Sequence, residues 1–173
     1  TKDAPGTSQV TAKNPNMMMN LGGKQKEEEY EDVMVDAIMD SGACDTITSR
    51  SIIGGNEVRP TKASAAGIGY YGPDGSPIKN RGESDIKGVS HDGVSLDFTA
   101  QIGDSVKRLL ISISNVTKAG NMVIFGADMN AIRALAKQDT VEPNVIVGIK
   151  SGMRSKIQEK NGMYLYPMKI RRL

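Results

Sequence analysis

An almost unbroken apolar run, Val33-Met34-Val35-Asp36-Ala37-Ile38-Met39, leads directly into the tetrapeptide Asp40-Ser41-Gly42-Ala43. A short apolar run that turn residues close is typical of a largely buried β-strand. This strand would deliver the Asp40 carboxylate to a tight loop, in which Gly42 permits a sharp backbone path and the close approach of another chain. Ser41 offers a hydroxyl that can bond across an interface, and Ala43 leaves space. We therefore expect a carboxylate with a chemical role at the end of a buried strand.

Beyond this loop, short apolar segments alternate with turn signals, which is typical of an all-β chain. Residues 72–77 (Gly-Pro-Asp-Gly-Ser-Pro) predict a hairpin between 68–71 and 78–80. Residues 91–93 (His-Asp-Gly) predict a second hairpin between 85–90 and 94–102, because Asp-Gly is a favoured turn dipeptide. We expect further strands at 109–113, 122–125, 145–147 and 163–166, and a short strand or turn at 51–53. We also expect one or two helical turns at 115–120 and a helix at 128–137. The sequence thus predicts a mostly β fold with a barrel-like sheet.

The charge distribution divides the chain of 173 residues into three parts. Residues 1–32 carry 4 basic and 6 acidic side chains and show no apolar periodicity, so we expect a disordered linker. Residues 33–120 carry 9 basic and 10 acidic side chains, whereas residues 121–173 carry 9 basic and 4 acidic ones, a net charge of +5. This basic part raises the hypothesis of nucleic-acid contact. A solvated basic surface is the interpretation that we favour, because no aromatic residues alternate with these charges as a single-strand binder would require.

The scarcity of reactive side chains excludes several chemistries. One cysteine and one histidine exclude an internal disulfide, a cysteine-based zinc cluster and a two-histidine metal site within one chain, so we expect no metal. Residues 67–72 match the dinucleotide pattern G-x-G-x-x-G, but the residues that follow do not begin a helix, so we expect no cofactor. Cys44 has no histidine near it in the sequence, and His91 is interpreted as a surface turn residue. Chemistry carried out by Asp or Glu carboxylates is therefore the one that the sequence supports.

The segment 37–47 (Ala-Ile-Met-Asp-Ser-Gly-Ala-Cys-Asp-Thr-Ile) resembles the active-site segment of retroviral-type, or retropepsin-like, aspartic proteases. It is most similar to the protease region of copia-type and related LTR-retrotransposon polyproteins. Later parts of that pattern follow in order over about residues 33–170: a Gly-rich hairpin at 75–82, a strand pair at 86–102, Leu-Ile-Ser-Ile-Ser at 110–114, Gly and Val-Ile-Phe at 120–125, and a closing strand at 161–166.

The resemblance implies a retropepsin-like acid-protease half-barrel with one short helix. The protease-like domain would span 33–120, and a basic α/β extension at 121–173 would pack on it or follow it. The implied catalytic residues are Asp40, Ser41 and Gly42, and the implied substrate-binding residues are Ala43, Asp45, Tyr70, Tyr71, Gly75, Ser76, Ile78 and Ile111. The hairpin around 70–78 would be a flap that closes over a polypeptide substrate.

Carboxylate chemistry then requires a second copy of the chain. Two close carboxylates cannot both ionise, so they share one proton and act as acid and base toward water. This chain offers one such motif, which implies a homodimer with Asp40 of each copy on its axis. No apolar run is long enough for a membrane helix and the N-terminal residues lack the order of a signal peptide, so we expect a cytoplasmic or virus-like-particle location without membrane contact.

Departures from the family pattern leave alternatives open. Ser112 follows Leu110-Ile111, as in the copia type, where retroviral enzymes carry glycine. Residues 124–128 are an alternative match to that element, with 128–137 as its helix, but we favour the first match because its distances from Asp40 fit a compact half-barrel. Cys44 stands where many relatives carry aspartate, and 127–144 resembles an insertion. The leading hypothesis is an aspartic endopeptidase that processes a retrotransposon or retrovirus-like polyprotein. The alternatives are a catalytically inactive dimeric scaffold of the same ancestry and a nucleic-acid-associated fragment.

Overall fold

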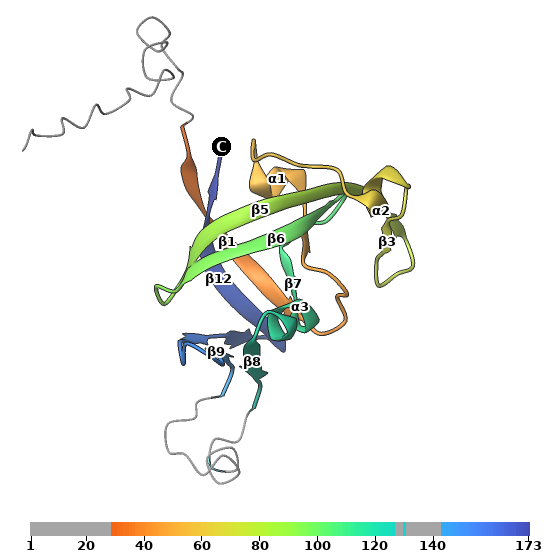
Figure 1. The fold of residues 1–173 in the computed structure, drawn as a ribbon. Helices are drawn as coiled ribbons and strands as arrows, with labels where there is room; N and C mark the ends of the chain where they lie inside the picture. Colours follow the sequence, from red (N-terminus) through yellow and green to blue (C-terminus); the bar gives the residue numbers. More distant parts are fainter. Residues whose placement is uncertain (1–28, 127–129, 131–142) are drawn as a thin grey trace, which may run out of the picture.

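The computed structural model describes residues 29–126, 130 and 143–173, and within these the fold is mostly β (Figure 1). Three α-helices are short: α1 (Arg50–Ile53), α2 (Lys62–Ala65) and α3 (Ile113–Lys118). The strands, in chain order, are β1 (Glu31–Asp40), β2 (Ile47–Thr48), β3 (Tyr70–Tyr71), β4 (Pro77–Ile78), β5 (Asn80–Ser90), β6 (Ser95–Gly103), β7 (Leu110–Ser112), β8 (Asn121–Ile124), β9 (Val145–Gly148), β10 (Arg154–Lys156), β11 (Gln158–Lys160) and β12 (Met163–Arg172).

Six strands close into a ring, in the order β1-β7-β2-β6-β5-β12, and β12 pairs back onto β1. The longest seams are antiparallel: β5 with β6, and β1 with β12 from Glu31↔Arg172 to Ile38↔Leu165. Two short seams are parallel, β1 with β7 and β2 with β6. The mostly β prediction is confirmed, and six of the described strands close into a ring. The retropepsin-like half-barrel stays a prediction.

The interior of the ring is aliphatic, as the scarcity of aromatic residues requires. Side chains alternate between buried and exposed along β5, the pattern of a strand with one face toward a core. The largest fully buried apolar side chains are Ile53, Ile86, Ile102, Leu109, Met168 and Ile170. Burying one such side chain contributes about 1.5–3 kcal/mol, so this cluster is the main source of stability.

Both predicted hairpins are present. The β5–β6 hairpin turns at Gly93, whose φ of 89° favours glycine, and β3 pairs with β4 at Tyr70↔Ile78. The glycine pattern at 67–72 leads from α2 into β3 and so opens a strand, as expected. Residues 51–53, expected as a strand or turn, lie instead in α1, because Ser49 in an extended conformation starts the helix and Ile53 can then be fully buried.

The ends of the ring differ from the expected boundaries. β1 begins at Glu31, within the predicted linker, because Glu31 pairs in the ladder with Arg172 and accepts a hydrogen bond of 2.6 Å from its Nε. β12 extends to Arg172 and is part of the ring, so residues 163–172 of the predicted extension belong to the main sheet. The first 28 residues of the linker and nearly all of the predicted helix at 128–137 lie outside the described residues.

A smaller sheet of β8, β9 and β10 lies beside the ring, below β12 and α3 in Figure 1. Asp92, in the β5–β6 turn, connects the two sheets by accepting hydrogen bonds from the Ser155 hydroxyl at 2.7 Å and from the backbone N–H of Lys156 at 2.7 Å. Among the helices in the described ranges, none has the length and apolar character that crossing a membrane requires.

Candidate active site

The loop that begins at Asp40 is held where two strands run in parallel. β1 pairs with β7 at Ile38↔Leu110, Met39↔Ile111 and Asp40↔Ser112. Met39 and Ile111 are buried in the core, whereas Asp40 is half-buried at the end of β1 and Ser41 and Gly42 are exposed. The predicted strand is present but less buried than expected, because only Ala37 and Met39 on β1 are buried and Met34 is exposed. Its buried end leads from the core to the half-buried Asp40 carboxylate.

The Asp40 side chain folds over its own loop. The backbone N–H of Gly42 donates a hydrogen bond to Asp40 Oδ1 at 2.7 Å, which fixes the orientation of the carboxylate. A Cβ at position 42 would lie 3.3 Å from the same oxygen, closer than side chains usually approach, so glycine gives the carboxylate room as well as a donor. Oδ1 is thus held by the backbone, while the exposed loop around it leaves the carboxyl group accessible to a partner.

Ser112, on β7, is fully buried and binds the backbone of the Asp40–Asp45 loop. Its hydroxyl donates to the carbonyl of Ala43 at 2.7 Å and accepts from the N–H of Asn115 at 3.3 Å, and its own N–H donates to Thr46 Oγ1 at 3.1 Å. One serine therefore connects the loop, β7 and the first turn of α3. In the sequence, Ser112 was notable only through its place in the family pattern. A serine three residues before Asn115 at a helix start is the local signal that could have identified it as a cap.

The predicted flap is tied to the same loop. The Tyr70 hydroxyl, on β3, donates to Asp45 Oδ2 at 2.9 Å. Burial of the phenol, together with its hydrogen bond to the Asp45 carboxylate, raises the pKa of Tyr70 above its usual range. Tyr70 and Asp45, both predicted to bind substrate, thus bind one another across 25 residues of sequence.

The remaining predicted residues divide between this region and the core. Tyr71 is 78% exposed, and Gly75 and Ser76 lie at the exposed tip of the hairpin, where the Ser76 hydroxyl donates to Asp74 at 2.6 Å. Ile78, on β4, is half-buried. Ile111 lies in the core, 7% exposed, so the structure does not bring it to the surface of the loop.

Cys44 and His91, to which the sequence analysis gives no catalytic role, are both exposed. Cys44 is exposed in the loop, and within the described residues no three His, Cys, Asp or Glu side chains gather as a metal site would require. His91 is exposed at the β5–β6 turn, and its Nε2 lies 2.7 Å from the carbonyl oxygen of Lys156, so this nitrogen carries the proton.

Comparison of the chain with protein-family models, curated proteins and solved structures finds no match.

Proposed function

We propose that this chain is an aspartic endopeptidase that acts as a homodimer, with Asp40 from two copies forming the catalytic pair. The observation that carries the proposal is the Asp40–Asp45 loop itself. A carboxylate oriented by the Gly42 N–H lies at the accessible end of β1, directly after the buried Met39, and a hairpin is connected to the same loop through Tyr70. The resemblance of residues 37–47 to retropepsin-like proteases supplies the reaction class, and a retrotransposon or retrovirus-like polyprotein is the proposed substrate.

The chemistry follows from the carboxylate pair. Two Asp40 side chains brought together on a twofold axis would share one proton, because like charges at contact distance cannot both remain ionised. The ionised carboxylate would take a proton from water as that water attacks the peptide carbonyl, and the protonated one would donate to the carbonyl oxygen. Ser41 and Gly42 are exposed beside Asp40 and can approach the second copy, while the hairpin would cover the substrate and exclude water.

The test compares Asp40→Asn with Asp36→Asn in the hydrolysis of an unfolded protein substrate at mildly acid pH. Asp36 is the matched control because it lies exposed on the same strand, four residues before Asp40, and receives the same substitution. Asp40→Asn should reduce hydrolysis by about 10³-fold or more, since an amide cannot act as the base or share the proton. Asp36→Asn should leave the rate unchanged. Hydrolysis that persists in Asp40→Asn would refute the proposal.

A mixing experiment tests the shared site. If each active site needs Asp40 from two copies, an excess of Asp40→Asn chain will lower the activity of the wild-type chain by forming mixed dimers, whereas an excess of Asp36→Asn chain will not. Specific activity should also rise with enzyme concentration and then level off. Activity that is indifferent to both treatments would show that one chain contains a complete site.

A further inference from the structure

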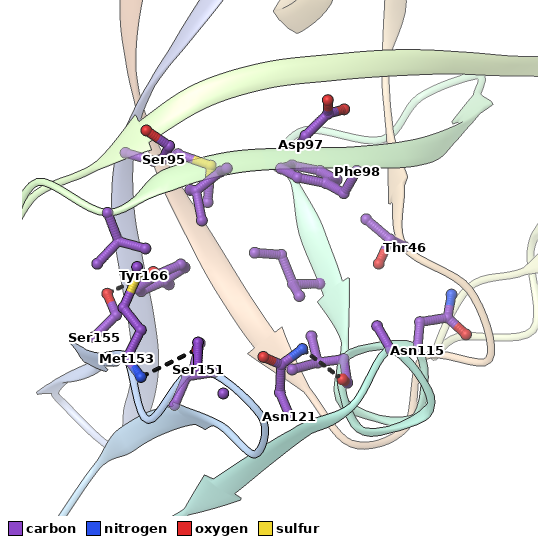
Figure 2. Close-up of a pocket in the computed structure, with 18 of the residues that line it drawn as sticks. Thr46, Ser95, Asp97, Phe98, Asn115, Asn121, Ser151, Met153, Ser155 and Tyr166 are labelled. Carbon is purple, nitrogen blue, oxygen red and sulfur yellow. Dashed lines mark hydrogen bonds between the residues drawn. The ribbon is translucent and has the colours of Figure 1, made fainter.

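A cavity of about 590 Å³ lies between β6, α3 and the smaller sheet, apart from the Asp40–Asp45 loop (Figure 2). Its walls are mainly apolar, and one of them consists of Val94 and the first five residues of β6, 95–99. Asn121 and Ser151 lie across the cavity from this strand in Figure 2, while Asp97 points from β6 away from the cavity. The volume is within the range of clefts that bind ligands. One wall of the cavity is therefore formed by the start of β6.

The backbone direction along β6 follows from two hydrogen bonds. Ser90 N–H donates to the carbonyl of Val94 at 2.8 Å, so residues 94, 96, 98 and 100 direct their backbone groups toward β5. The alternate residues direct theirs away from β5. Gln101 confirms this, because its N–H donates at 2.8 Å to the carbonyl of Thr46 on the opposite side. The outward N–H and C=O groups of Ser95, Asp97 and Thr99 must therefore face the free side of the strand.

These groups have no partner strand among the described residues. β2 is two residues long and pairs with β6 only at Gln101 and Ile102, so the ring leaves the rest of this side of β6 uncovered. Ser95, Asp97 and Thr99 are exposed, whereas Leu96 and Phe98 pack against the core and line the cavity. An uncovered strand edge beside an apolar cavity presents main-chain groups for pairing and a pocket for alternate side chains.

We propose that the free edge of β6, from Ser95 to Thr99, is a docking site for an extended polypeptide segment of a partner protein. The segment would add as a strand in line with β2, with alternate apolar side chains in the cavity. The exposed Asp97 carboxylate selects a basic side chain at the position opposite it. The same charge disfavours a second copy of this chain, because antiparallel pairing of two β6 edges centred on Asp97 would place two carboxylates side by side. This site is independent of the proposed protease activity.

The probe is a labelled seven-residue peptide of alternating valine and lysine, and amide hydrogen exchange is the readout. Without peptide, the amides of Ser95, Asp97 and Thr99 should exchange fast, and those of Leu96 and Phe98 slowly because they bond to β5. With peptide in excess, the three fast amides should become at least about fivefold slower, the effect of one backbone hydrogen bond, while the slow ones stay unchanged. Absence of binding, or protection that does not follow this alternation, would overturn the proposal.

Two controls separate strand addition from other binding. The same peptide with alternate backbone nitrogens methylated keeps its side chains and loses its donors on one edge, so its affinity should fall by about tenfold or more. In the protein, Asp97→Pro removes an outward N–H without breaking the β5 ladder and should weaken binding more than Asp97→Asn, which removes only the charge. Equal binding of both peptides would refute the site. Tighter binding of a peptide with the chain's own sequence 94–100 would assign the edge to a second copy instead.

Discussion

Replacing Ser112 with alanine tests whether one buried hydroxyl supports the candidate loop. This hydroxyl donates to the carbonyl of Ala43 and accepts from the N–H of Asn115, and the side chain is 0% exposed. Alanine fits the space but leaves both backbone groups without their partner in a region that water does not reach freely. Because an unsatisfied polar group costs more than a hydrogen bond contributes, Ser112→Ala should be distinctly destabilising.

The magnitude follows from two contributions. Loss of the hydrogen bond to Ala43, which is 2.7 Å long and partly buried, should cost about 1 kcal/mol. Loss of the helix cap at the start of α3 should cost about 1 kcal/mol more. The expected decrease in the free energy of unfolding is therefore about 2 kcal/mol. With a urea dependence of about 2 kcal/mol per molar, typical of a domain of this size, the unfolding midpoint should fall by about 1 M.

Urea unfolding followed by far-ultraviolet circular dichroism measures this change, and Ser114→Ala is the matched control. Ser114 lies two residues later in α3 with its side chain exposed, so its replacement should change stability by less than about 0.5 kcal/mol. A Ser112→Ala variant within about 0.5 kcal/mol of the wild-type chain would show that water or a local shift replaces both bonds. The reasoning that connects β7 to the Asp40 loop would then be wrong.

Three further perturbations test other parts of the structure. Tyr70→Phe removes the hydrogen bond to Asp45 and should accelerate amide exchange in the β3–β4 hairpin by about fivefold, without changing exchange in the ring. Unchanged exchange in the hairpin would show that the hairpin does not depend on this hydrogen bond. The Thr48 hydroxyl is fully buried and has no hydrogen-bond partner among the residues that the structure describes. Thr48→Val should therefore raise the free energy of unfolding by about 1 kcal/mol in thermal denaturation, and a loss of stability would imply a partner. Burial alone would raise the pKa of Asp92, but hydrogen bonds from Ser90, Ser155 and the Lys156 N–H outweigh it and lower the pKa from 3.8 to about 2. The ionised Asp92 therefore stabilises the fold above about pH 4, and this stability is lost as the pH falls toward 2. Asp92→Asn should lower the free energy of unfolding by about 1 kcal/mol at neutral pH, after allowance for solvent screening. It should also reduce the change in stability that urea unfolding measures between about pH 4 and pH 2.

The local features of the fold could be predicted from the sequence. The strand before Asp40 and the turn at Gly93 depend on a few neighbouring residues: an apolar run, a turn dipeptide and a glycine that accepts positive φ. The start of α1 shows the limit of this reasoning. Residues 51–53 are apolar enough for a strand, but burial of Ile53 in the core favours a helical turn.

The sequence by itself determined that a carboxylate ends a strand, that two hairpins follow it in the chain, and that sulfur and imidazole side chains are scarce. Tertiary structure alone decided that β12 closes the ring on β1, that Ser112 reaches the Ala43 carbonyl 69 residues away, and that Tyr70 binds Asp45. It also decided which edge of β6 stays uncovered. These are pairings between distant segments, and their cost in chain entropy is met only when the whole core forms, so no short window of residues encodes them.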